Sequence, residues 1–71
     1  MINLEQFYLY CLEFYGKGGI YDYAFTREQV EAATRLYISR LNSHYHVQEF
    51  CGDTVDRENV RDIILDEPEL V

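Results

Sequence analysis

LEQFYLYCLEFY, residues 4–15, is the stretch that decides the fold predicted for this chain. At about 100° per residue, most of its apolar side chains fall within an arc of roughly 160°, wider than the stripe of a helix that packs against one neighbour. These side chains are Leu4, Phe7, Tyr8, Cys11, Leu12, Phe14 and Tyr15. The pattern predicts a helix that ends at Gly16 and forms the centre of a small core.

Leu9 and Tyr10 fall outside even this wide arc, so the predicted helix is apolar over more of its circumference than two neighbouring helices can cover. We therefore expect a homodimer, because two-fold symmetric pairing is the commonest way in which a small chain buries such a surface. The predicted interface consists of Leu9, Tyr10, Phe14, Tyr21 and Tyr23. In the alternative, residues 20–25 fold back and cover this flank within one chain.

Three helix starts share the same chemistry, in which a capping residue is followed three positions later by an amide side chain. The pairs are Asn3 with Gln6, Thr26 with Gln29, and Asp56 with Asn59. The capping side chain can accept a hydrogen bond from a free backbone N–H of the first turn. The sequence therefore predicts three helices.

The ends of the second and third helices follow from residues that do not favour a helix. The second is predicted over residues 27–41, with Asn42 and Ser43 ending it. The third is predicted over residues 57–66, because Pro68 cannot continue a helix.

Two connections between the predicted helices contain alternating apolar residues. Residues 20–25 carry an aromatic side chain at every second position, and residues 44–50 alternate more loosely. Each segment predicts either a short strand or an extended loop, and two strands alone would make a poor sheet. The expected fold class is mainly α: a compact three-helix domain over residues 1–66 with two extended connections, followed by an acidic C-terminal tail over residues 67–71.

The charge balance is that of a small acidic domain. The 71 residues contain 6 Lys and Arg against 13 Asp and Glu, which gives a net charge of −7. A core of this size stabilises the folded state by roughly 3–5 kcal/mol, so a partner, a second copy or a ligand is expected. The apolar fraction of 48% excludes a disordered acidic chain.

The cellular setting is predicted from what the sequence lacks. No apolar run approaches the roughly 18–20 residues that cross a bilayer, and the first residues lack the basic start of a signal peptide. We therefore expect a cytoplasmic protein with no membrane contact. Cys11 and Cys51 are too few for a disulfide scaffold, and both are expected to be reduced.

Few residues offer catalytic or metal-binding chemistry. His44 and His46 could bind a metal with Glu49, Cys51 or Asp53, but this spacing matches no zinc signature. Cys51 beside either histidine is the arrangement that suggests a nucleophile, and proximity in sequence alone supports it. We expect no enzymatic activity, no bound metal and no cofactor.

The negative charge favours one class of function over another. A compact acidic domain can bind a basic surface on another protein, so we predict a non-catalytic interaction module such as an adaptor or inhibitor. The alternative is a nucleic-acid-associated regulator, which the charge disfavours and which needs a contiguous basic face. Its candidate residues are Arg27, Arg35, Arg40, Arg57 and Arg61. Arginines paired with acids would support the interaction module instead.

Overall fold

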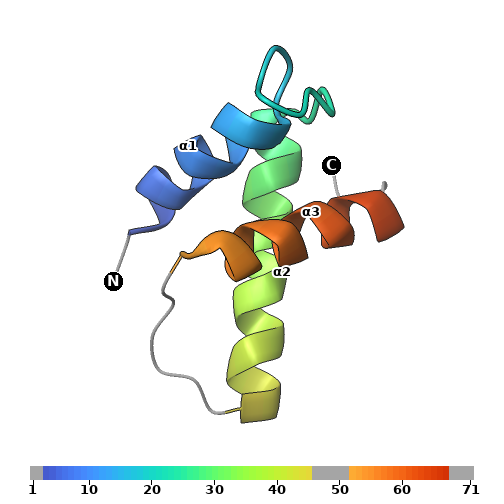
Figure 1. The fold of residues 1–71 in the computed structure, drawn as a ribbon. Helices are drawn as coiled ribbons and strands as arrows, with labels where there is room; N and C mark the ends of the chain where they lie inside the picture. The colour runs from blue at the N-terminus through green and yellow to red at the C-terminus, as the bar shows by residue number, and fades with distance from the viewer. Residues whose placement is uncertain (1–2, 46–51, 68–71) are drawn as a thin grey trace.

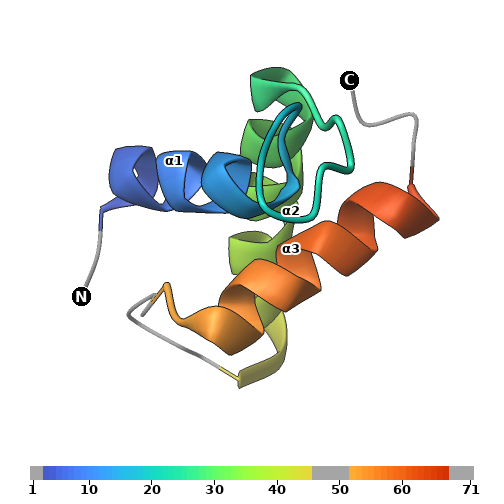
Figure 2. The same ribbon diagram turned by 45° about the horizontal axis from the view of Figure 1, so that its top comes forward.

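Three helices and their connections make up the part of the chain that the computed structural model describes, residues 3–45 and 52–67. They are α1 (Leu4–Tyr15), α2 (Arg27–Tyr45) and α3 (Thr54–Asp66). Figure 1 shows α1 and α3 lying across α2, and Figure 2 shows the same arrangement from another side. Each helix contacts the other two. The predicted mainly α, three-helix fold is confirmed, and α1 has the bounds that its sequence predicts.

The core lies where the three helices meet. Phe7, Cys11 and Tyr15 of α1 are at most 1% exposed, and Val30 of α2 and Val60 of α3 are fully buried. Each helix therefore contributes one apolar face to a shared core, and no helix can bury its apolar residues without the other two.

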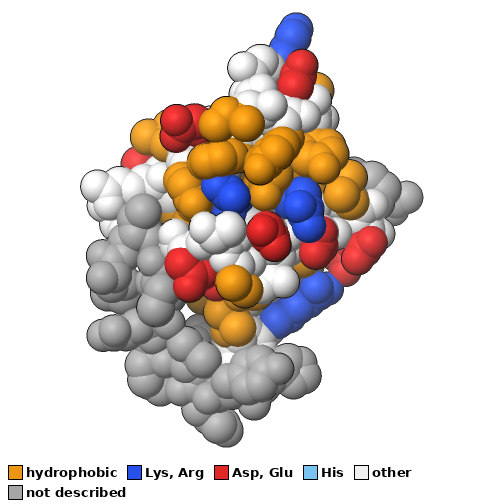
Figure 3. Space-filling model, in the orientation of Figure 1, with side chains coloured by type: hydrophobic (Ala, Val, Ile, Leu, Met, Phe, Trp, Pro, Cys, Tyr) orange, Lys and Arg blue, Asp and Glu red, His pale blue; other side chains and the backbone are white. Residues whose placement is uncertain are grey.

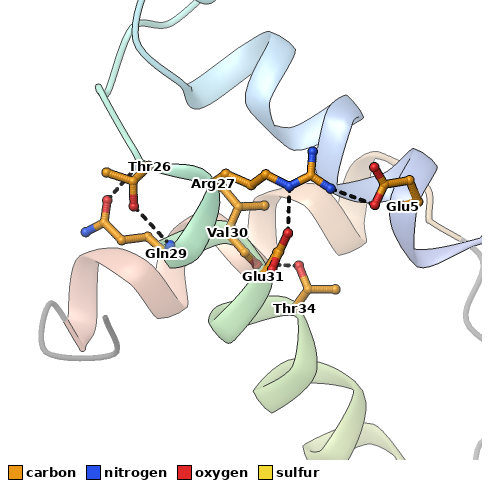
Figure 4. Close-up of polar contacts among 7 residues, drawn as sticks. All are labelled: Glu5, Thr26, Arg27, Gln29, Val30, Glu31 and Thr34. Atoms are coloured by element: carbon orange, nitrogen blue, oxygen red, sulfur yellow. Dashed lines mark hydrogen bonds and ion pairs between the residues drawn. The ribbon is translucent and has the colours of Figure 1, made fainter.

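The N-terminus of α2 carries the capping box that its sequence predicts (Figure 4). The Thr26 hydroxyl accepts the Gln29 backbone N–H (3.1 Å), and the Gln29 side-chain oxygen accepts the Thr26 N–H (2.9 Å). These bonds satisfy two backbone donors at the start of the helix. The next residue, Arg27, forms ion pairs of 2.6 Å with Glu5 of α1 and Glu31 of α2, which tie the start of α2 to α1.

Thr26→Ala is expected to lower the free energy of unfolding by about 1 kcal/mol, because it removes the capping oxygen and leaves the body of the helix unchanged. Thermal unfolding followed by circular dichroism should show a fall in Tm of roughly 4–8 °C. Thr26→Ser keeps the hydroxyl and should unfold near the wild-type temperature. Equal losses in the two variants would show that the methyl group, and not the cap, matters here.

The end of α2 differs from the prediction. The sequence predicts an end at Asn42 and Ser43, whereas α2 continues to Tyr45. The prediction is wrong because Asn and Ser disfavour a helix by less than about 1 kcal/mol each, and neither removes a backbone hydrogen bond as proline does. Residues 44 and 45 are therefore helical, and the remainder of the connection predicted there, residues 46–50, lies outside the described residues.

The start of α3 also differs from the prediction, because Asp53 and not Asp56 is the N-cap. The Asp53 carboxylate accepts the Asp56 N–H (3.0 Å), and the Asp56 carboxylate accepts the Asp53 N–H (3.2 Å). The two acids form a capping box in which Asp56 is the third helical residue. Capping chemistry alone could not choose between two acids three positions apart, and the prediction chose the wrong one.

The connection between α1 and α2 is a loop. The described residues contain no strand, and this loop makes one isolated bridge between Gly16 and Phe25. Residues 20–25 therefore do not form the short strand that their alternation allowed, and the backbone N–H groups of Ile20, Tyr21 and Phe25 bond to the end of α1 instead of to a neighbouring strand.

Glu67 follows the last turn of α3. Its N–H donates to the Ile63 carbonyl (2.8 Å), and its side chain accepts a hydrogen bond from Arg40 of α2 (2.6 Å). The first residue of the predicted tail is therefore joined to the domain, and residues 68–71 lie outside the part that the structure describes.

Candidate functional site

The loop between α1 and α2 folds back onto the end of α1. Its backbone N–H groups donate to carbonyls of the last turn of α1: Ile20 to Glu13 (3.0 Å), Tyr21 to Phe14 (2.7 Å) and Phe25 to Tyr15 (3.2 Å). These carbonyls would otherwise lack a partner at the helix end. The same bonds place the aromatic side chains of the loop beside those of α1.

Aromatic side chains from α1 and the loop form a continuous surface, which we call the aromatic face. Its members are Tyr10, Phe14, Tyr21 and Tyr23, which pack around the buried ring of Tyr15. The ring centroids lie 5.3 Å apart for Tyr10 and Phe14, 5.9 Å for Phe14 and Tyr21, and 5.5 Å for Tyr15 and Tyr23. Tyr21 also stacks on Tyr15 at 5.6 Å. Rings attract one another at such distances, so the aromatic face is held in one arrangement.

The outer part of the aromatic face is open to solvent. Tyr21 is 56% exposed, Tyr23 is 44% exposed and the adjacent Ile20 is 63% exposed. Figure 3 shows hydrophobic side chains gathered over α1 and the loop, with basic side chains at the boundary toward α3. A group of large apolar side chains that stays exposed usually marks a surface that contacts another molecule.

Two loop residues hold left-handed backbone conformations on either side of Tyr23. The φ angle is 46° at Asp22 and 59° at Ala24. This conformation costs a residue other than glycine roughly 1–2 kcal/mol. The Asp22 carboxylate accepts the Gly18 N–H at 3.0 Å, which helps to hold the loop in this shape. Backbone strain of this kind is concentrated at functional sites, where it fixes the position of a neighbouring side chain.

Arg57 of α3 lies beneath the aromatic face. It is 6% exposed, and its guanidinium carbon is 3.7 Å from the Phe14 ring centroid and 5.0 Å from that of Tyr10. One guanidinium N–H donates to the Tyr10 hydroxyl (3.0 Å), while the buried Nε has no hydrogen-bond partner. The ion pairs of the described residues do not include Arg57. Ring faces therefore stabilise its charge, and Arg57 joins the aromatic face to α3.

Most arginines of the nucleic-acid hypothesis are paired with acids. Carboxylates pair with three of them: Arg27 with Glu5 and Glu31, Arg40 with Glu67, and Arg61 with Asp62. Arg35 is exposed, and Arg57 is buried. Three of the five arginines are thus held by carboxylates, whereas a nucleic-acid-binding surface needs several basic side chains that neutralise phosphates together. The nucleic-acid-associated regulator stays a hypothesis.

Four of the five predicted interface residues belong to the aromatic face: Tyr10, Phe14, Tyr21 and Tyr23. Leu9 does not, since it lies about 100° around α1 from Tyr10 and is 52% exposed on its own. The loop packs on Phe14, as the fold-back alternative expects, but its own tyrosines then form the exposed surface. The homodimer stays a prediction.

A polar network that the sequence patterns did not predict joins α2 and α3. The Tyr37 hydroxyl donates to the Asp56 carboxylate (2.6 Å) and accepts the Asn59 side-chain N–H (3.1 Å), and Asp56 also accepts the Gly52 N–H (2.8 Å). Burial, and then the hydrogen bond to Asp56, raises the pKa of Tyr37 to about 12. A buried tyrosine hydroxyl usually has a hydrogen-bond partner. The position of Tyr37 on the apolar side of its predicted helix therefore indicated that a polar partner lies nearby.

Cys11 is expected to be chemically inert in the folded protein. It is fully buried, and burial raises the pKa of its thiol to about 12 although Arg57 opposes the shift. The thiolate is the reactive form of cysteine. In a Cys51→Ser variant, Cys11 should therefore react with DTNB very slowly in native buffer and rapidly in guanidinium chloride. Similar rates under the two conditions would mean that the core around Cys11 opens readily.

The metal and nucleophile hypotheses rest mostly on side chains that the structure does not describe, those of His44, His46, Glu49 and Cys51. Asp53 caps α3. Among the described residues, no group of three or more His, Cys, Asp or Glu side chains is placed to hold a metal ion.

Comparisons with known proteins add no functional assignment. The sequence matches no protein-family model, and searches of curated proteins and of solved structures find no match. Within residues 3–45 and 52–67, no helix is long and apolar enough to span a membrane. The chemistry of the aromatic face therefore carries the functional argument.

Proposed function

We propose that this protein is a non-catalytic protein-binding module and that the aromatic face is its binding surface. The observation that carries this proposal is that Tyr21 and Tyr23 stay about half-exposed while their rings pack on Phe14 and Tyr15. Rings held in this way lose little conformational freedom when they bind. Tyrosine is also among the residues that contribute most to the affinity of protein interfaces.

The charge of the chain supports a partner with a basic surface. The net charge is −7, and most arginines of the described residues are paired with acids or buried. Glu28, Glu58 and Asp66 are exposed and form no ion pair within the described residues. The negative electrostatic field of these charges steers a basic partner toward the molecule. A cytoplasmic location, where thiols stay reduced, belongs to the same proposal.

Sedimentation equilibrium at micromolar concentration tests whether the partner is a second copy. If a second copy covers the aromatic face, the wild type is dimeric and the Tyr21→Ser/Tyr23→Ser variant is monomeric, because a two-fold interface would contain both tyrosines twice. Leu65→Ser removes an exposed apolar side chain outside the aromatic face and should stay dimeric. A monomeric wild type at high micromolar concentration would refute the homodimer.

Affinity capture from an extract of the native host tests binding to a different protein. The wild type and Leu65→Ser should retain basic proteins that Tyr21→Ser/Tyr23→Ser loses, with circular dichroism confirming that the double variant is folded. The proposal fails if the folded double variant retains the same proteins. Recovery of nucleic acid that depends on Arg35 would instead support the nucleic-acid-associated regulator.

A further inference from the structure

A groove runs between α2 and α3, on the side of α3 that faces away from the aromatic face. Its volume is about 430 Å³, within the range of small ligand-binding clefts. Tyr37 and Leu41 of α2 line it, together with Asn59, Asp62, Ile63 and Asp66 of α3. Asp66 lies about 180° around α3 from Arg57, so the groove and the aromatic face are separate surfaces.

Hydrogen bonds hold the inner end of the groove in place. The Asn59 side chain donates to the Tyr37 hydroxyl (3.1 Å), which donates in turn to Asp56 (2.6 Å). Ile63 is 7% exposed and forms an apolar wall with Leu41. A cleft whose walls are fixed before binding loses little entropy when it is occupied.

Carboxylates dominate the edge of the groove. Asp62 and Asp66 are exposed and lie one helical turn apart on α3. Arg61 bonds to one oxygen of Asp62, whereas Asp66 forms no ion pair within the described residues. Arg40, the basic residue of the lining, is held by Glu67 at 2.6 Å. The groove therefore combines an apolar wall with acceptor atoms that carry negative charge.

We propose that this groove binds an amphipathic segment of another protein through a lysine or arginine side chain. The cationic group lies between Asp62 and Asp66, and apolar side chains of the same segment cover Leu41 and Ile63. The net charge of −7 attracts such a segment over a distance and repels an acidic one. The inference rests on the proposed function for the basic character of the partner, but it uses a separate surface, so either proposal can fail alone.

The test uses an amphipathic peptide of leucine and lysine, about 14 residues long so that it can form a helix. Isothermal titration calorimetry measures its affinity for the full chain, and chemical shifts of the ¹⁵N-labelled protein locate it. We expect the largest shift changes at Leu41, Asn59 and Ile63. Asp62→Asn/Asp66→Asn should weaken binding about tenfold or more, because two charge contacts are lost. Asp66→Asn alone breaks no contact of the described residues and should weaken binding less.

Matched variants separate the groove from general attraction by charge. Glu13→Gln/Glu28→Gln removes the same number of exposed negative charges outside the groove and should bind the peptide nearly as well as the wild type. Tyr21→Ser/Tyr23→Ser should also bind it, which distinguishes this surface from the aromatic face. Four results would overturn the proposal: no binding of the lysine peptide, equal binding of a peptide with glutamate in place of lysine, equal weakening by Glu13→Gln/Glu28→Gln, or shift changes confined to the aromatic face.

Discussion

Arg57→Ala is expected to lower the free energy of unfolding by about 3 kcal/mol, one of the two largest effects that we predict. The substitution leaves a cavity at a position where the arginine is only 6% exposed to solvent. It also removes the contacts of the guanidinium with Phe14 and Tyr10 and the hydrogen bond to the Tyr10 hydroxyl. Truncation of a large buried side chain to alanine typically costs about 2–5 kcal/mol.

Urea unfolding followed by circular dichroism measures this loss, and the whole domain has only roughly 3–5 kcal/mol to lose. Arg57→Met is the matched control, since it keeps most of the volume and removes both the charge and the unpaired Nε. Tyr10 is partly exposed, so we expect its hydroxyl to bond to water in this variant. We therefore expect Arg57→Met to lie within about 1 kcal/mol of the wild type. A loss in Arg57→Met as large as that in Arg57→Ala would show that the charge itself stabilises the fold.

Asp56→Ala is expected to lower the free energy of unfolding by about 2–3 kcal/mol. Its carboxylate accepts hydrogen bonds from the Tyr37 hydroxyl and from the Gly52 and Asp53 N–H groups, so one substitution removes half of the capping box and the polar link between α2 and α3. Removal of a buried acceptor leaves its donors without a partner, which costs more than the hydrogen bonds alone.

Asp62→Ala is the control for Asp56→Ala, because Asp62 is an acid on the same helix that is exposed and pairs with Arg61 at the surface. Its loss should change the free energy of unfolding by less than about 1 kcal/mol. Tyr37→Phe should have an intermediate effect, since it removes the link to α2 and keeps the cap. Equal stabilities of Asp56→Ala and Asp62→Ala would contradict the role of the network.

Local chemistry was sufficient to predict α1 and the start of α2. Asn3 accepts the Gln6 N–H at 2.8 Å, and Thr26 and Gln29 form the reciprocal pair that their spacing suggests. Each of these bonds joins residues three positions apart, and the backbone of the first helical turn brings such residues together whatever the rest of the chain does. The wide apolar arc of residues 4–15 predicted a central helix. Phe7, Cys11 and Tyr15 are buried, but α2 is the helix that the other two lie across (Figure 1).

Helix boundaries were less predictable where several residues suit the same role. Asp53 and Asp56 are both good caps, and the choice of Asp53 places Asp56 where its carboxylate reaches Tyr37 of α2. Asn42 and Ser43 disfavour a helix too weakly to end α2. In both cases the alternative helix ends differ little in local free energy, so contacts with other helices can decide where the helix begins or ends.

The sequence by itself thus established the three helices, the contribution of α1 to the core and the acidic charge. Only the tertiary structure decided which side chains form the exposed surfaces. Arg57 was one of five candidate nucleic-acid-binding arginines in the sequence, yet it bonds to a tyrosine 47 positions away and is buried. Tyr21 and Tyr23 became the outer rings because their loop bonds to the end of α1, and the groove exists because α3 crosses α2. Contacts between residues so far apart depend on how the helices pack, and no local spacing in the chain encodes that packing.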